Sequence, residues 1–159
     1  MKFREMKRQK QQLSNEECLQ LLKQETRCVL SVNGDEGYPY GMPMNYWYDE
    51  NSGSIYMHGG KTGHKIEAIR KNDKVSLCIC EHGERKNGDW FYTVRSVIIF
   101  GRARLIDDME RVVSISRSLS LRFTDDNDYI ESEIAASAKG TLLIEVVPQH
   151  ICGKRVTEK

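Results

Sequence analysis

Residues 27–58 read RCVLSVNGDEGYPYGMPMNYWYDENSGSIYMH, and this stretch decides the fold. Its β-branched and apolar runs predict three strands, at Arg27–Val32, Tyr38–Tyr48 and Ser54–His58. Asn33-Gly34 and Gly37 supply the positive-φ positions of the first turn, and residues 50–53 form the second. Pro39 and Pro43 interrupt hydrogen bonding within the second strand, which favours an edge or a bulge for it. The stretch therefore predicts a run of antiparallel hairpins.

The pattern outside this stretch adds helices around the hairpins. Ser14 and Glu17 form a capping box at the start of a predicted helix. The expected helices are Ser14–Lys23, Thr62–Lys71, Asp107–Leu121 and Asn127–Ala138, with Asp107 and Asp108 interpreted as capping residues. The further strands are Val75–Cys80, one bent strand or two over Trp90–Leu105, and Thr141–His150. Regular βαβ alternation is missing from this order. This order of strands and helices predicts a mainly β fold, a small antiparallel barrel with peripheral helices.

Composition limits the classes of function. The 159 residues carry 24 Lys and Arg against 23 Asp and Glu, so the net charge is +1 and favours neither nucleic acid nor an anionic membrane. We expect a single domain over residues 1–159, with 1–12 as an N-terminal arm that is solvated or crosses a dimer. The arm lacks the apolar core of a secretory signal, and no apolar run approaches the roughly 20 residues of a membrane span. Five cysteines without framework spacing indicate reduced thiols and a cytoplasmic protein.

The loop from His58 to Lys65, HGGKTGHK, joins a predicted strand to a predicted helix. Its glycines allow the backbone to approach a ligand closely, and Thr62 is the expected N-cap. Lys61, His64 and Lys65 surround the first turn, where free amides and the helix dipole favour an anion. The loop therefore indicates a phosphate site, while a surface loop with solvated lysines remains the alternative.

Other residues allow competing interpretations. Cys78, Cys80 and His82 alternate as metal ligands could, but no second pair accompanies them, so we expect buried structural cysteines and no metal. Trp90-Phe91-Tyr92 before Arg95 could bind single-stranded nucleic acid, although packing in the core or a dimer interface suits the low net charge better. A lone His58 is more often structural than catalytic, but its near-neutral pKa makes proton transfer feasible.

Four segments together resemble a known family. They are Tyr38–Tyr46 (YPYGMPMNY), Ile55–His58 (IYMH), Gly63–Ile66 (GHKI) and Arg95–Ala103 (RSVIIFGRA). In order and spacing they are similar to the FMN-binding split-barrel proteins of the pyridoxamine 5′-phosphate oxidase-like family, nearest to its nitroimidazole-resistance branch. The resemblance runs from about Arg4 to Lys154.

This resemblance implies a split β-barrel homodimer with FMN at the subunit interface. The implied FMN-binding residues are Gly41, Met42, Pro43, Met44, Asn45, His58, Lys61, Thr62, His64, Lys65, Trp90, Arg95, Ser96 and Lys154. His58 is the implied catalytic residue, and Trp90, Arg95 and Ser96 are expected to come from the partner subunit. Apart from the resemblance, a flavin needs a flat apolar slot, which Tyr38, Met42, Met44 and Trp90 could supply. Cys152 stands where the family usually has Thr or Ser, which weakens a hydroxyl contact there.

Two functions remain open at this point. One is an FMN-dependent oxidoreductase of the nitroimidazole-reductase type, which passes electrons from a nicotinamide donor to a small-molecule acceptor. The other is a flavin- or haem-binding module that does not turn over. A nucleic-acid-binding barrel is the least favoured alternative.

Overall fold

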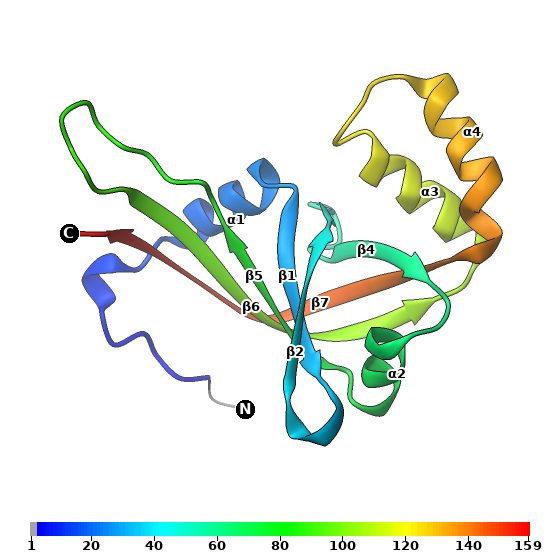
Figure 1. Cartoon of the computed structure of the whole chain (residues 1–159), viewed down its shortest axis with the longest axis horizontal. Helices are drawn as coiled ribbons and strands as arrows, with labels where there is room; N and C mark the ends of the chain where they lie inside the picture. The colour runs from blue at the N-terminus through cyan, green and yellow to red at the C-terminus, as the bar shows by residue number, and fades with distance from the viewer. Residues whose placement is uncertain (1–2) are drawn as a thin grey trace.

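The computed structural model describes residues 3–159 and contains one curled antiparallel sheet (Figure 1). Its seven strands lie in the order β2-β1-β5-β6-β7-β4-β3. The strands are β1 Arg27–Asn33, β2 Pro39–Asn45, β3 Trp47–Tyr48, β4 Ile55–Gly60, β5 Lys74–Cys80, β6 Thr93–Ile106 and β7 Thr141–Thr157. The helices are α1 Asn15–Gln24, α2 His64–Lys71, α3 Met109–Ser120 and α4 Asn127–Ser137, with short 3₁₀ turns at Gln9–Gln11, Asp35–Gly37 and Ala138–Gly140. This half-barrel with peripheral helices confirms the predicted fold class.

Alternation of side chains places the core on the inner face of the sheet. In β5, the side chains of Val75, Leu77 and Ile79 are buried, whereas Cys78 is half-buried and Cys80 is exposed. Successive residues of a strand point to opposite faces, so both cysteines lie on the outer face. The prediction that they are buried was therefore wrong, because the apolar residues between them take the core positions.

The second predicted strand is divided in two. β2 ends at Asn45 and β3 begins at Trp47, because Tyr46 turns inward between them. The Tyr46 ring is fully buried, and its hydroxyl donates to the carbonyl oxygen of Leu22 at 2.9 Å. β2 lies at one edge of the sheet, as Pro39 and Pro43 predicted.

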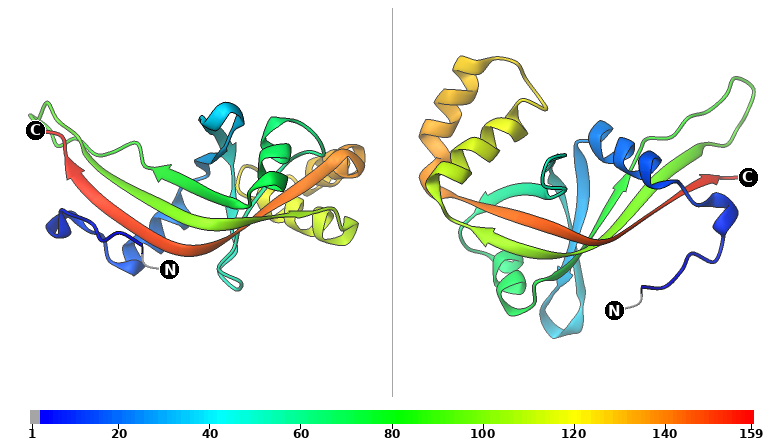
Figure 2. Two further views of the ribbon diagram at one scale, coloured as in Figure 1. Left: turned by 90° about the horizontal axis from the view of Figure 1, so that it is seen from below. Right: turned by 180° about the vertical axis from the view of Figure 1, so that it is seen from behind.

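The longest strands are β6 and β7; β6 pairs with β7 along its whole length, and the two strands carry the curl of the sheet (Figure 2). Their register shifts at Phe100/Gly101. A Cβ on Gly101 would lie 2.6 Å from the carbonyl oxygen of Val147, so the strands approach closely only because this position is glycine. β7 continues to Thr157 rather than ending at His150, since β6 offers a partner along that distance. β6 is one strand and begins at Thr93, which leaves Trp90 in the preceding loop.

Local signals locate most helix boundaries. The Ser14/Glu17 capping box is present, and Asp108 and Asp126 cap α3 and α4. At α2 the prediction was wrong: the N-cap is Gly63, not Thr62. Gly63 has φ 111° and ψ 170°, which are not helical values, so the first helical residue is His64 and not Gly63 as capping by Thr62 would require.

Two hydrophobic clusters hold the helices to the sheet. The larger one fills the inner face of the sheet beneath α1 and α2. The smaller one lies under α3 and α4, where Val112, Ile130 and Ile134 pack against Tyr56 and Leu143 of the sheet. Figure 1 shows this helical pair, α3 and α4, at the end of the molecule opposite the C-terminus.

The N-terminal arm lies against its own sheet. Gln12 bridges to Lys154, and the Phe3 ring stacks on His150 with centroids 4.7 Å apart. Met1 and Lys2, which the prediction included in the arm, lie outside the described residues. Within residues 3–159, no helix combines the length and apolarity needed to cross a membrane.

Candidate functional site

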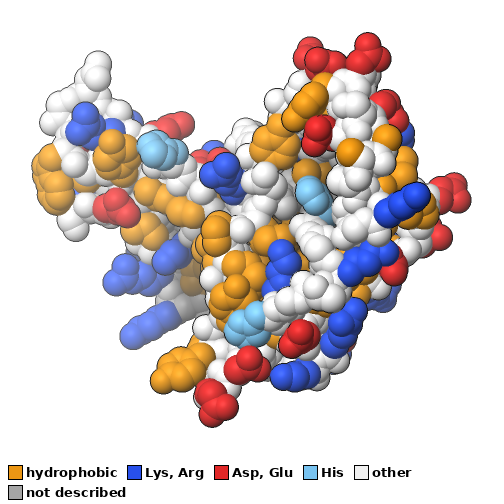
Figure 3. Space-filling view, turned by 45° about the vertical axis from the view of Figure 1, so that its right-hand side comes forward, with side chains coloured by type: hydrophobic (Ala, Val, Ile, Leu, Met, Phe, Trp, Pro, Cys, Tyr) orange, Lys and Arg blue, Asp and Glu red, His pale blue; other side chains and the backbone are white. Residues whose placement is uncertain are grey.

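A cationic pocket lies where the two ends of the curled sheet approach each other. β2, at one edge, contacts β4 near the opposite edge, although the two strands are not hydrogen-bonded neighbours. The cavity between them has a volume of about 340 Å³. Arg27, Pro43, Met44, Asn45, His58 and Lys65 line it, and we call it the cationic pocket. Figure 3 shows blue and pale-blue basic side chains among hydrophobic ones on this side of the molecule.

Lys65 is the central cation of this pocket. It lies in the first turn of α2, and its side chain crosses back over β4. A Cβ on Gly59 would lie 2.9 Å from Lys65 Nζ, so the missing side chain at Gly59 makes room for the ammonium group. Lys65 Nζ also lies 3.6 Å from Met44 Sδ. The chain thus holds one positive charge between β2 and β4, beside the N-terminus of a helix, where an anion is stabilised.

His58 forms the floor of the pocket. The residue as a whole is exposed, although neighbouring protein atoms partly desolvate its ring. Burial and the positive charge of Lys65 both lower the pKa of His58 from its usual 6.5. The imidazole is therefore mainly neutral at pH 7, and it can donate one hydrogen bond and accept another.

This coupling gives a first prediction. In Lys65→Met the pKa of His58 is expected to rise toward its usual value, because a neighbouring positive charge no longer opposes protonation. The measurement is an NMR titration of the histidine Cε1 protons, with the His58 signal assigned from its loss in His58→Gln. Lys61→Met is the matched control and should leave the titration unchanged. An unchanged or lower His58 pKa in Lys65→Met would contradict the described contact.

Arg27 is a pocket residue that the sequence analysis missed. It begins β1 and faces Asn45 across the β1–β2 pair, where its Nε donates to Asn45 Oδ1 at 3.2 Å. The hairpin register was the available signal, since pairing outward from the predicted turn brings a basic residue opposite Asn45. Arg27 adds a second permanent cation to the pocket and orients the Asn45 amide.

The loop residues before Lys65 divide into different roles. The His64 ring stacks on Tyr40 with centroids 4.3 Å apart, and its Nε2 lies 3.5 Å from an Asp35 carboxylate oxygen. Lys61 pairs with Asp107 at 2.6 Å. Neither side chain lines the cationic pocket, and Thr62 is an exposed turn residue. The structure thus concentrates the side-chain charge of this loop at Lys65.

β2 contributes its last three residues to the pocket. The side chains of Pro43, Met44 and Asn45 line it, whereas the Met42 side chain is buried in the main core. Met42 therefore does not form a wall of an apolar slot, contrary to the prediction, because its position in β2 faces inward. Gly41 is exposed, and a Cβ there would lie 3.3 Å from side-chain atoms of both Ser31 and Val29, so glycine allows these β1 side chains to pack closely against β2.

The remaining predicted residues lie elsewhere in the same chain. Trp90 is 76% exposed in the β5–β6 loop, and Tyr38 is 74% exposed in the β1–β2 hairpin. The Arg95 guanidinium donates twice to Glu81 Oε2, from Nη2 at 2.7 Å and from Nε at 2.9 Å. Ser96 pairs with Lys154 in the β6–β7 register, far along the sheet from α2. These residues do not line the cationic pocket of their own chain.

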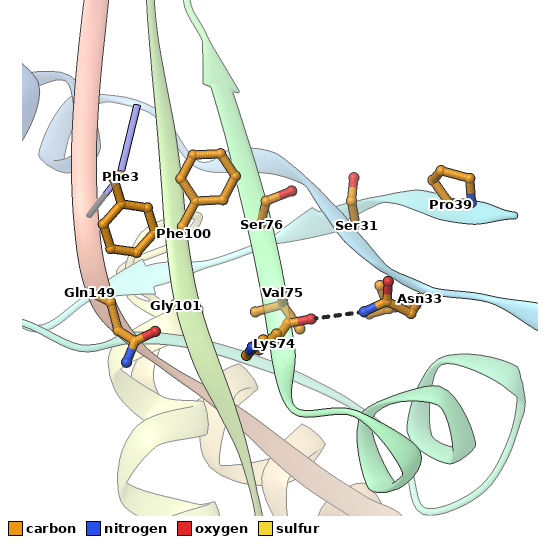
Figure 4. Close-up of a pocket in the computed structure, with 11 residues that line it drawn as sticks. Phe3, Ser31, Asn33, Pro39, Lys74, Val75, Ser76, Phe100, Gly101 and Gln149 are labelled. Atoms are coloured by element: carbon orange, nitrogen blue, oxygen red, sulfur yellow. Dashed lines mark hydrogen bonds between the residues drawn. The ribbon is translucent and has the colours of Figure 1, made fainter. Parts of the chain in front are cut away.

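A different cavity opens on the outer face of the sheet, with a volume of about 280 Å³ (Figure 4). Phe3, Phe100, Ser31, Ser76 and Lys74 are among its lining residues, and Asn33 Nδ2 donates to the Lys74 carbonyl oxygen beside it at 3.4 Å. It contains none of the residues that the sequence predicts for a cofactor. Across residues 3–159, no cluster of three or more His, Cys, Asp or Glu side chains is arranged to hold a metal ion.

Known proteins share this sequence pattern and fold. The sequence model of the pyridoxamine 5′-phosphate oxidase family matches residues 14–155. A Bacteroides thetaiotaomicron protein, described as a candidate 5-nitroimidazole antibiotic resistance protein, is 22% identical with a TM-score of 0.75, covering 92% of this chain and 87% of its own. A FAD-binding protein from Mesorhizobium loti is 20% identical with a TM-score of 0.69, and the match covers 91% of this chain and 96% of that one.

A third protein of known structure with a similar fold is described as binding two cofactors. It is a FAD and haem binding protein from Mycobacterium smegmatis, 16% identical with a TM-score of 0.72, and the match covers 94% of this chain and 74% of that one. No curated protein is significantly similar to the sequence. At these identities the structural matches establish a shared fold, and the family match covers nearly the whole described sheet.

Proposed function

The chain belongs to the pyridoxamine 5′-phosphate oxidase family, and from this premise we propose that it is an FMN-dependent oxidoreductase of the nitroimidazole-reductase type. In this proposal FMN binds at the cationic pocket and passes electrons from a nicotinamide donor to a small acceptor. The observation that carries the proposal is the placement of Lys65 and Arg27 in one pocket with Asn45 and His58. The free thiols of all five cysteines are consistent with a cytoplasmic protein.

The residues present suit the parts of FMN. Lys65, Arg27 and the first amides of α2 provide donors and positive charge for a phosphate dianion. The exposed β2 residues Pro43 and Asn45, which line the pocket, leave that side of the strand open to a flat group. When bound, the flavin supplies the two-electron chemistry. In this proposal His58 holds or releases a proton at a ring nitrogen beside that group, and its lowered pKa supports a neutral imidazole in that role.

The test of this proposal is spectroscopic. Purified chain titrated with FMN should acquire the two visible absorption bands of a bound flavin, with FAD as the competing flavin. Anaerobic NADH or NADPH should then bleach these bands, and a nitroaromatic acceptor should restore them. A chain that binds no FMN would contradict the proposal.

A non-catalytic flavin- or haem-binding module is the second candidate, because the Mycobacterium smegmatis protein with a similar fold is described as binding both FAD and haem. Titration with haem separates the two candidates. A Soret band together with weak FMN binding would favour a haem module, and bound flavin that neither nicotinamide reduces would favour a flavin carrier.

We also propose that two chains form a homodimer through the outer face of the sheet, with FMN at the interface. Val29 and Phe100 are each 41% exposed on this face, beside Ile98 and the outer cavity. Trp90, Arg95 and Ser96 do not reach the pocket of their own chain, so in a dimer they are available to the partner's pocket. Light scattering should give twice the 18.4 kDa chain mass, whereas a monomer holding FMN would contradict the proposed interface.

A further inference from the structure

A second pocket adjoins the cationic pocket beneath the helical pair of α3 and α4. Its volume is about 280 Å³, and Asn45 and His58 line both pockets. The rest of its wall comes from the two helices, the segment between them and Thr141 at the start of β7. Figure 3 shows hydrophobic side chains beside a hollow under the helical pair, with a histidine side chain in the same region. We call this second space the helical-pair pocket.

The helical-pair pocket has a mixed wall, in which apolar and aromatic side chains from the two helices lie among polar ones. Leu119 and Ile134 are buried in its wall, while Phe123 and Tyr129 remain 49% and 56% exposed at its rim. Large aromatic rings left open beside a cavity suit stacking with a planar ligand. Ser116, Ser120 and Thr124 add a row of hydroxyls at helical spacing.

Charge distinguishes the two pockets. The cationic pocket contains Arg27 and Lys65, whereas the described residues that line the helical-pair pocket include no lysine or arginine and have Glu133 as their one acidic residue. An anionic ligand would therefore meet repulsion in the helical-pair pocket and attraction in its neighbour. A neutral or cationic ligand has the opposite preference.

The helical-pair pocket is also preformed. Arg117 of α3 binds Glu131 of α4 through two contacts, at 2.6 and 2.9 Å. Arg122, just after α3, donates to the carbonyl oxygen of Glu25 beyond α1 at 2.7 Å. These contacts tie the two helices to each other and to the sheet side of the pocket. A pocket held open in this way requires little ordering when a ligand binds.

We propose that the helical-pair pocket binds the small molecule that reacts at the flavin, and that this molecule is planar, largely apolar, and uncharged or cationic. The inference rests on the proposed function and specifies its substrate class. His58 connects the two sites, because its ring belongs to the wall of both. A ligand under the helical pair therefore contacts the same side chain as a group held in the cationic pocket.

Three probes of one size test the charge preference: benzamide, benzamidine and benzoate, titrated by NMR into the chain purified with FMN. We expect benzamide and benzamidine to shift resonances of α3 and α4 and to bind more tightly than benzoate. Glu133→Gln should reduce the preference for benzamidine over benzoate by roughly two- to fivefold, as expected for one exposed charge. Equal binding of all three probes, or shifts confined to other surfaces, would overturn the proposal.

A space-filling substitution tests the location. Ser120→Trp should weaken benzamide binding by at least about tenfold, because the indole occupies the pocket. Ser114→Trp is the matched control on the same helix, since Ser114 is exposed and does not line the pocket. Unchanged benzamide affinity in Ser120→Trp would overturn the assignment.

The flavin spectrum separates this inference from the proposed function. Ser120→Trp that keeps its bound FMN but loses benzamide supports the helical-pair pocket as a distinct substrate site. Wild-type chain that binds FMN but no probe overturns this inference and leaves the proposed function intact. Wild-type chain that binds benzamide under the helical pair but no FMN overturns the proposed function and, with it, the assignment of the ligand as a flavin substrate.

Discussion

Replacing Lys65 with methionine is expected to weaken FMN binding by roughly 10- to 100-fold, equivalent to ~1.5–3 kcal/mol for a charge-assisted hydrogen bond. Methionine keeps most of the length of the side chain and removes the ammonium group. The effect follows from the position of Lys65 Nζ over Gly59 and beside Met44, in the cavity where the proposed phosphate lies. The measurement is a fluorescence titration of FMN with wild-type and variant chains.

Two further variants make this prediction specific. Lys61→Met is the matched control, because the Lys61 ammonium is paired with Asp107 and does not line the pocket. It should change FMN affinity by less than about threefold, the size of an exposed ion pair. Lys65→Arg should restore part of the affinity, since it returns a positive charge. Equal losses in Lys61→Met and Lys65→Met would show that the loop acts only through its overall charge.

Leu77→Ala is expected to lower the free energy of unfolding by about 2–5 kcal/mol, because it leaves a cavity in the main core. Leu77 is fully buried on the inner face of β5. Its neighbour Cys78 points to the outer face, so Cys78→Ala should cost less than about 1 kcal/mol in the same assay. Urea unfolding followed by circular dichroism at one protein concentration measures both variants.

The paired design also tests the correction to the sequence-based interpretation of the cysteines. If Cys78→Ala destabilised the chain as much as Leu77→Ala, the inward and outward faces of β5 would have to be exchanged. A loss of self-association in Cys78→Ala without a loss of monomer stability would instead agree with an outer face that serves as an interface.

Signals between residues close in the sequence predicted their structures well. The Ser14/Glu17 box and the Asp108 cap are formed as expected, since each depends on atoms three residues apart. Pro39 and Pro43 correctly indicated an edge strand, because proline lacks the amide hydrogen that an inner strand needs. The alternation of apolar residues also gave the fold class, although it did not show that β7 continues past His150.

The candidate site was less predictable. The loop sequence indicated an anion site, but it assigned similar roles to Lys61, His64 and Lys65. In the structure only Lys65 lines the cationic pocket, because Asp107 pairs with Lys61 and Tyr40 stacks on His64. Asp107 lies 46 residues from Lys61 and Tyr40 lies 24 residues from His64, so no local pattern predicts these partners.

The sequence by itself determined the antiparallel hairpins, the capped helices, the glycine-rich approach to α2 and the family. Each of these depends on backbone preferences or on residues near one another in the chain. Only the tertiary structure decided which side chains share a cavity. The curl of the sheet brings β2 to β4, adds Arg27 to the cationic pocket and places the helical pair over His58. That outcome depends on twist summed over seven strands and on packing between distant segments, which no short stretch of sequence encodes.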